Sequence, residues 1–244
     1  MNYLKQEIID KIKASIKENQ GIQKIYQERF VNYRGKTTDT KEYYTEVVAE
    51  ELLRNNILGS MGSINEIVRK SGYKVDSHDG VSHTVGSNRK EEIFCKDIFS
   101  LSKNGQKHFN EVGLIIDYQV PLKNRSSDTG VGKIDLISKT KDELWLLELK
   151  VEDNKETVLR CVLEIATYYQ LLSKTKFLES YPEAATSSIS DIRKGILVVK
   201  GSSQEAELDE MKCGQNKRDN LKIIMESLKV EAFTIDINHD VVKK

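Results

Sequence analysis

Hydrophobic positions recur at helical spacing in the first third of the chain. One face of residues 2–19 carries apolar side chains three or four positions apart, namely Leu4, Ile8, Ile9, Ile12 and Ile16. This spacing predicts an amphipathic helix. Similar patterns predict helices at 39–55 and at 63–70, the second capped by Ser63. Residues 71–88 are rich in Gly, Ser, Asp and His and are predicted to form a linker or long loop.

Beyond residue 88 the pattern alternates between helical and strand periods. It predicts helices at 88–103 (capped by Ser87 or Asn88), 156–174 and 205–229 (with a break near Gly214), and strands at 113–123, 132–139, 143–151, 194–201 and 231–237. The order α-β-β-β-α-β-α-β predicts an α/β fold, in which a mixed sheet is flanked by helices. We therefore expect a helical N-terminal region over 1–84 and an α/β core over 85–244.

Composition places the chain among globular proteins. Its 244 residues are enough for one large domain, and 38% are hydrophobic. No apolar run approaches the roughly 18 residues of a membrane span, and the N-terminus lacks the apolar core of a secretory signal. The three cysteines, Cys95, Cys161 and Cys213, form no CxxC pair, which favours reduced thiols over a zinc or iron–sulfur site. We expect a cytoplasmic protein without a membrane partner.

Charge is balanced, with 38 basic and 38 acidic residues. Nucleic-acid-binding proteins usually carry a basic excess, so any such surface here must be local, and the balance counts mildly against obligate tight DNA binding. Residues 1–36 are the basic end, with eight Lys or Arg against four Asp or Glu. This end is therefore a candidate element for substrate recognition or assembly.

Charged residues interrupt a hairpin that is otherwise apolar, KIDLISKTKDELWLLELK at 133–150. If residues 140–143 form its loop, Asp135 lies opposite Glu148, with Cβ atoms roughly 4.5–5.5 Å apart. Opposed like charges are destabilising, and a hard cation such as Mg²⁺ would offset that cost. Lys150 lies on the face of Glu148, where it could position or deprotonate an attacking water, or steady negative charge on a phosphate. The alternative is a salt-bridged face open to solvent.

Gly132-x-x-Asp135, followed by Glu148-Leu149-Lys150 on the next strand, resembles the PD-(D/E)xK nuclease superfamily. The resemblance covers about 85–237, although Ile134 replaces the proline of the family name. It implies a restriction-endonuclease-like fold and a hydrolase that cleaves nucleic acid, with DNA favoured, using Mg²⁺ or Mn²⁺. Asp135 and Glu148 would be metal ligands and Lys150 the catalytic lysine. Endonuclease and exonuclease action both stay open.

The family also places an acidic residue on the helix before the first strand. Glu91 fits best, because it shares a helix face with Phe94 and Ile98, and Glu92 is the second choice. By the resemblance Glu91 would be a third metal ligand. The alternative is that both acids lie in solvent and complement the dipole at the helix N-terminus.

Some members of the superfamily carry a Gln-x-x-x-Tyr pair on the following helix. The corresponding residues here are Glu164 and Tyr168, with Arg160 one turn earlier on the same face. The resemblance makes these three candidates for substrate contact. The glutamate weakens assignment to the exonuclease branch that uses the pair, and an Arg160–Glu164 ion pair at i, i+4 is the alternative for the arginine.

Two hypotheses of different classes follow. The first is a metal-dependent nuclease. The second is a catalytically inactive nuclease-like fold that binds nucleic acid or protein, and a homo-oligomer is compatible with both. A further acidic and histidine cluster, Asp76, His78, Asp79 and His83, lies in the 71–88 segment, where a flexible loop is favoured over a metal site.

Overall fold

The computed structural model describes residues 2–17, 22–78, 89–125, 128, 131–184, 187–212 and 217–244. Within them, six strands form one mixed sheet in the order β1-β2-β3-β4-β5-β6. The strands are β1 (Leu114–Pro121), β2 (Lys133–Lys139), β3 (Leu144–Lys150), β4 (Ile192–Val199), β5 (Val230–Ile235) and β6 (Val241–Lys243). Strands β3, β4 and β5 are parallel, and the remaining neighbours are antiparallel. The predicted α/β architecture with a mixed sheet is confirmed.

Parallel neighbours need long crossover connections, which helices provide. The described helices are α1 (Lys5–Lys17), α2 (Tyr44–Arg54), α3 (Lys90–Gly105), α4 (Val158–Leu171), α5 (Lys174–Ser180), α6 (Ser203–Lys212) and α7 (Asp219–Leu228). Shorter 3₁₀ turns are η1 (Ile22–Gln27), η2 (Arg29–Asn32), η3 (Leu58–Ser63), η4 (Pro182–Ala184) and η5 (Ile189–Asp191). Helices α4 and α5 lie between β3 and β4 in the chain, and α6 and α7 lie between β4 and β5.

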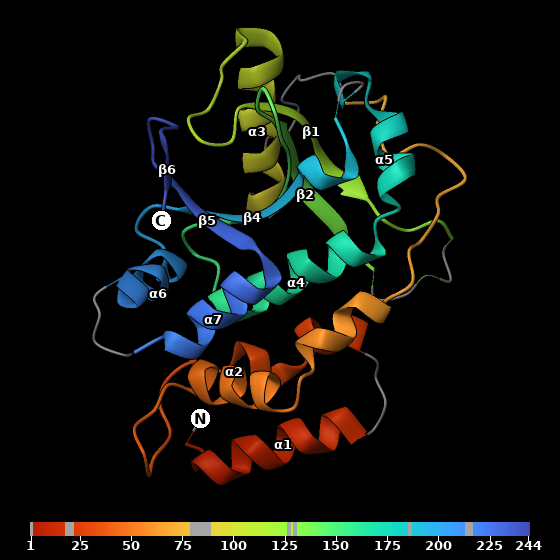
Figure 1. The fold of residues 1–244 in the computed structure, drawn as a ribbon. Helices are drawn as coiled ribbons and strands as arrows, with labels where there is room; N and C mark the ends of the chain where they lie inside the picture. The colour runs from red at the N-terminus through yellow and green to blue at the C-terminus, as the bar shows by residue number, and fades with distance from the viewer. Residues whose placement is uncertain are drawn as a thin grey trace.

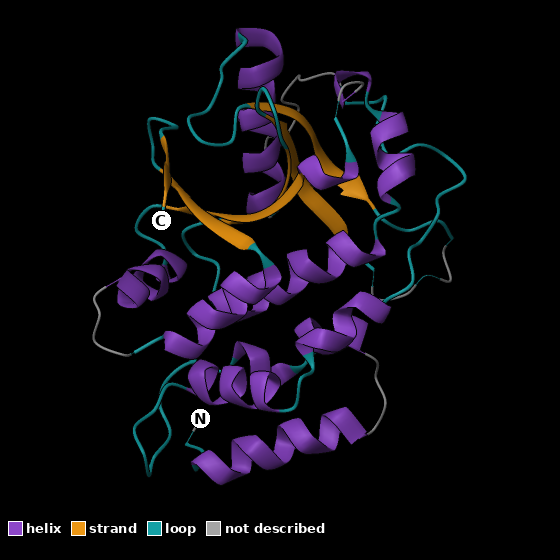
Figure 2. Ribbon diagram, in the orientation of Figure 1, coloured by secondary structure: helices purple, strands orange, loops and turns teal. Residues whose placement is uncertain are grey.

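Helices cover both faces of the sheet, as Figures 1 and 2 show. Helix α3 packs on one face over a cluster that includes Phe99, Trp145 and Phe233. Helix α4 covers the other face, and α2 lies between α7 and the outermost helix, α1 (Figure 1). Apolar side chains form one continuous cluster from α1 through α2 and α4 to the sheet. The N-terminal helices therefore share a core with the α/β part.

The predicted strands match β1 to β5 within a few residues, and the helix predicted at 63–70 is wrong. The turn η3 ends at Ser63, and Ile67 instead forms a β-bridge beside Leu172, with its N–H donating to the carbonyl of Leu171 at 2.7 Å. This contact at the end of α4 overrides a weak helical propensity. Helix α5 and strand β6 were not predicted.

Two further predictions concern termini of helices. The expected caps Ser87 and Asn88, and the expected break at Gly214, lie outside the described residues, as does Cys213. Helix α3 has Arg89 at its N-cap position, where no side chain caps the helix. The described residues between Ser203 and Leu228 form two helices, α6 and α7. None of the described helices is long and apolar enough to cross a membrane.

Candidate active site

The β2–β3 hairpin brings Asp135 and Glu148 to the same place on the sheet. Leu136 pairs with Leu147 and Ile137 with Leu146, and the loop closes where the N–H of Thr140 donates to the carbonyl of Glu143 at 2.9 Å. The next pair in this register is Asp135 and Glu148. The predicted four-residue loop and its register are confirmed.

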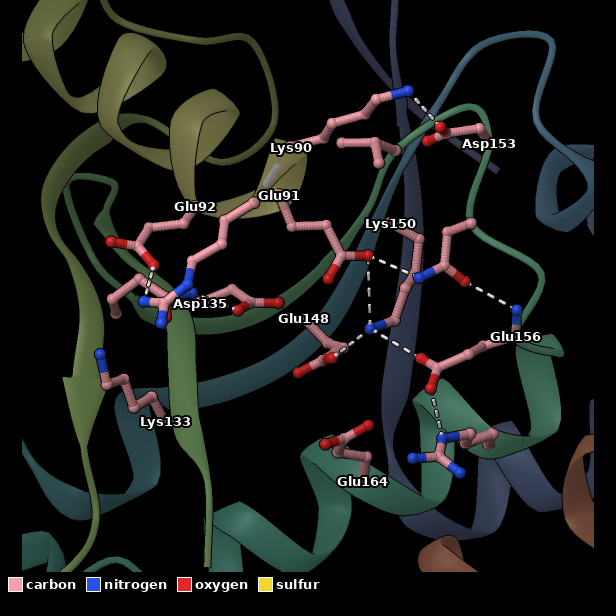
Figure 3. Close-up of a pocket in the computed structure, with 15 residues that line it drawn as sticks. Lys90, Glu91, Glu92, Lys133, Asp135, Glu148, Lys150, Asp153, Glu156 and Glu164 are labelled. Carbon is pink, nitrogen blue, oxygen red and sulfur yellow. Dashed lines mark hydrogen bonds and ion pairs between the residues drawn. The ribbon is translucent and has the colours of Figure 1, made fainter. Parts of the chain in front are cut away.

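These residues line a cleft of about 630 Å³ between the start of α3, strands β1 to β3 and the first half of α4. Its walls are mainly charged: Arg89, Lys90, Glu91, Glu92, Gln119, Lys133, Asp135, Glu148, Lys150, Val151, Asp153, Asn154, Glu156, Arg160 and Glu164. Figure 3 shows the carboxylates of Glu91, Glu148 and Glu156 gathered around Lys150. All of the predicted site residues except Tyr168 line this cleft.

Asp135 is held by two hydrogen bonds. The side chain of Gln119 on β1 donates to Oδ1 at 2.7 Å, and the backbone N–H of Leu149 donates to Oδ2 at 2.9 Å. Burial raises the pKa of Asp135 to about 7, although Lys150 opposes the rise. The carboxylate is therefore fixed in orientation and costly to charge.

Glu148 and Lys150 form a buried ion pair. The ammonium of Lys150 donates to Oε1 of Glu148 at 2.7 Å, and lies 2.9 Å from Oε2 of Glu156. Oε2 of Glu148 is buried and accepts no hydrogen bond from any residue that the structure describes. Burial and the nearby charge of Asp135 raise the pKa of Glu148 well above its usual value. Burial opposes the charged form of Lys150, but its carboxylate neighbours, Glu148 foremost, raise its pKa.

Glu91 reaches the cleft from the first turn of α3. Its Oε1 accepts a hydrogen bond from Nδ2 of Asn154 at 2.6 Å and lies 3.8 Å from the ammonium of Lys150. Glu92 instead pairs with Arg89 at 3.1 Å. Glu91 is therefore the acidic residue of α3 that contacts the central lysine.

On α4, Glu164 accepts a hydrogen bond from the hydroxyl of Tyr168 at 2.7 Å. Burial raises the pKa of Glu164, while Lys150 lowers it. The hydroxyl of Tyr168 occupies the space beside Gly132, where an added Cβ would lie 2.0 Å from its oxygen. Arg160 forms its ion pair with Glu156 at 2.7 Å, in place of the pair with Glu164 that was weighed from the sequence.

Three polar residues that contact the predicted site residues directly were missed in the sequence: Gln119, Asn154 and Glu156. Gln119 contacts Asp135 from a different strand, and no local pattern marks it. Asn154 meets Glu91 across 63 positions of the chain. Only Glu156 carried a signal, because it stands four residues before Arg160, at the spacing of a helical ion pair.

The donor set fits a hard divalent cation held by few protein ligands. Mg²⁺ prefers oxygen and is commonly bound through one or two carboxylates with water completing its shell. Asp135 and Glu148 supply two buried carboxylates, and Oε2 of Glu148 has an unused lone pair. Across the described parts of the chain, no three His, Cys, Asp or Glu side chains converge as a ready-made metal cage. Such a cation would therefore keep part of its water.

The cluster at 71–88 is only partly described. Asp79 and His83 lie outside the described residues. The Nδ1 of His78 lies 2.5 Å from Oδ1 of Asp117, a buried residue of β1. His78 is thus attached to the sheet on the α3 side, stacked on Tyr118 with ring centroids 3.8 Å apart.

Comparisons with known proteins give little further information. No family model matches the chain, and no curated protein matches it. Among solved structures, the chain is similar to SfsA of Pyrococcus furiosus in complex with Ca²⁺, with 12% identity over 72% of this chain and 73% of that chain. The TM-score is 0.28, which is too low to establish a common fold or function.

Proposed function

We propose that this protein is a metal-dependent nuclease of the PD-(D/E)xK type that hydrolyses phosphodiester bonds in nucleic acid. The observation that supports the proposal most is the buried pair Asp135 and Glu148, with an unpartnered carboxylate oxygen beside Lys150. A buried carboxylate oxygen without a partner is costly, and a protein gains nothing in stability by retaining it. A bound cation gives that oxygen a role.

Asp135 and Glu148 would hold Mg²⁺ or Mn²⁺, with Glu91 at the edge of the same site. When bound, the metal supplies a Lewis acid for the phosphate and lowers the pKa of a water. Gln119 and the N–H of Leu149 fix the carboxylate of Asp135. Although burial opposes it, the carboxylate neighbours of Lys150 raise its pKa, which favours the charged ammonium. The role that we propose for Lys150 is therefore to stabilise negative charge and orient the attacking water.

Cations at the rim of the cleft support a polyanionic substrate, although Arg89, Lys90 and Arg160 also pair with acidic side chains. Arg89 and Lys90 are largely exposed there, and Lys133 and Arg160 line the same cavity. Exposed Arg and Lys side chains contact phosphates without requiring a basic excess in the whole chain. DNA is the substrate that we propose, on the basis of the resemblance of the motif.

A non-catalytic module that binds nucleic acid or protein is the second candidate. One observation favours it: Lys150 already forms ion pairs with Glu148 and Glu156, and so compensates part of the negative charge without a metal. In this case the acidic cluster would be a structural network, and binding would not depend on Mg²⁺.

Metal titration with a cleavage assay separates the two candidates. Mg²⁺ and Mn²⁺ are titrated calorimetrically into the wild type, the Asp135→Ala/Glu148→Ala double variant and an Asp142→Ala control in the exposed hairpin turn. Plasmid and single-stranded DNA are then incubated with the same samples. The nuclease proposal predicts metal binding and cleavage by the wild type and the control, and neither by the double variant. DNA binding without metal binding or cleavage would favour the second candidate.

A further inference from the structure

A second cavity, of about 810 Å³, lies at the other end of α4 from the acidic cleft. Tyr169, near the last turn of α4, lines it, together with the starts of β4 and β5 and one side of α7. Lys194 on β4 pairs with Leu146 of β3, on the same face of the sheet as Glu148. The two cavities share no lining residue.

Positive charge dominates this second cavity. The basic residues that line it are Arg193, Lys194, Lys222, Lys229, Lys243 and Lys244, against the acidic residues Asp219, Glu226 and Glu231. Three of the basic residues have acidic partners: Arg193 pairs with Glu143, Lys243 with Glu231, and Lys244 with Glu205 and Asp209. Among the described residues, Lys194, Lys222 and Lys229 form no ion pair.

Lys194 is the innermost of these cations. Its ammonium lies 4.1 Å from the centroid of the Tyr169 ring, and the side chain is half-buried. Burial lowers its pKa to about 8, and the charges that lower it further are Lys229, Lys174 and Arg193, all positive. A desolvated cation surrounded by like charges is costly unless an anion compensates it.

Apart from Ser190, the rest of the wall is apolar or aromatic. Its apolar side chains are Ile192, Leu208, Met211, Met225, Val230 and Ala232. A volume of this size, with an apolar lining and a few convergent charged groups, is typical of small-molecule sites. A bare inorganic ion would satisfy the lysines and leave this wall without contacts.

We propose that the cavity binds a small organic phosphate of mononucleotide size, with the phosphate at Lys194 and Lys229 and the apolar body against Met225 and Ile192. The lysines would form ion pairs with the phosphate, and the apolar wall would contact the organic part of the ligand that carries it. The site is independent of the metal-dependent cleft, because it uses neither Asp135 nor Glu148.

Calorimetric titration of adenosine monophosphate, adenosine and inorganic phosphate into the full-length protein tests this proposal. The variants are Lys194→Met, which keeps an unbranched chain only one atom shorter and removes its charge, and Lys13→Met, a control on the exposed side of α1. The wild type and the control should bind one adenosine monophosphate, with inorganic phosphate at least 10-fold weaker and adenosine not bound. Lys194→Met should lower the affinity for the monophosphate at least 10-fold.

Three outcomes would overturn the proposal. They are no binding of the monophosphate to the wild type, binding that Lys194→Met leaves unchanged, and equal losses in Lys194→Met and Lys13→Met, which would show non-specific attraction to surface charge. Circular dichroism of each variant checks that it is folded. We expect Lys194→Met to fold normally, because the lysine that it removes forms no ion pair with any described residue.

Discussion

The buried carboxylate of Asp117 lies on the same sheet as the buried carboxylates of the cleft, Asp135 and Glu148, but its surroundings differ from theirs. Asp117 on β1 is 2% exposed and accepts four hydrogen bonds, two on each oxygen. The donors are the N–H groups of Tyr118 and Val75, the hydroxyl of Tyr181 and Nδ1 of His78, at 2.5 to 3.1 Å. Asp117 thereby attaches residues 75–78 and the end of α5 to the sheet.

The carboxylates of the cleft are not satisfied in this way. Asp135 and Glu148 stand in opposed register, their pKa values are raised, and one buried oxygen of Glu148 has no partner among the described residues. Burial is common to both groups, so burial alone does not distinguish a structural carboxylate from a functional one. We propose that the number of donors does: the fully bonded carboxylate of Asp117 stabilises the fold, and the incompletely bonded carboxylate of Glu148 is available for a ligand.

The largest effect on stability is expected at Asp117. Asp117→Ala leaves four donors without an acceptor, the Tyr118 N–H and the Tyr181 hydroxyl among them buried, and we expect a loss of about 3–5 kcal/mol in the free energy of unfolding. Urea denaturation measures it, with Asp142→Ala in the exposed hairpin turn as the control. A loss below about 1 kcal/mol would show that the network around Asp117 is not structural.

A smaller loss is expected at Gly132. In Gly132→Ala the new Cβ would lie 2.0 Å from the hydroxyl oxygen of Tyr168, and overpacking of this kind costs about 1–3 kcal/mol. Removing that hydroxyl in a Gly132→Ala/Tyr168→Phe double variant should recover part of the loss. If the double variant is no more stable than Gly132→Ala, the contact between Gly132 and Tyr168 does not set the position of the tyrosine.

Gln119 tests whether Asp135 needs positioning. Gln119→Leu removes the donor to Oδ1, and we expect about a 10- to 100-fold loss of metal affinity and cleavage, as for other residues that orient a metal ligand. The loss of unfolding free energy should be only about 1 kcal/mol, because the N–H of Leu149 still binds the carboxylate. Gln119→Asn keeps the amide but shortens the side chain, so it also tests the position of the donor. Full metal affinity in either variant would show that the side chain has no positioning role.

Lys194 extends the comparison to a half-buried cation. Its pKa is about 8 in the folded protein and near 10.5 when unfolded, so between these values the unfolded chain binds the extra proton. Charged Lys194 therefore destabilises the folded protein fully below pH 8, and this destabilisation decreases as the pH rises toward 10.5. The stability of the wild type relative to Lys194→Met should rise over that interval in urea denaturation. A constant difference would show that Lys194 titrates normally.

Local patterns were sufficient to predict the hairpin and much of the cleft. Asp135, Glu148 and Lys150 lie on adjacent strands joined by a short loop, so alternation and loop length fix their positions. Glu91 followed from the resemblance, which implies an acidic residue on this helix, and the period of α3 favoured it over Glu92. The bonds around Asp117 could not be predicted, because they join residues 39 and 64 positions apart in segments without a strong period. Gln119 was missed for a similar reason, since its partner is on another strand.

The central claim is that the unpartnered oxygen of Glu148 serves a metal rather than the fold. The most direct test is the thermal midpoint of the wild type and Glu148→Gln, each with and without Mn²⁺. Gln keeps an acceptor for Lys150, whose ammonium also keeps its ion pair with Glu156, and it removes the like charge opposite Asp135. The variant should therefore be at least as stable as the wild type without metal. Mn²⁺ should raise the midpoint of the wild type and leave that of Glu148→Gln unchanged. A variant that is clearly less stable without metal, or equal shifts in both proteins, would contradict the account.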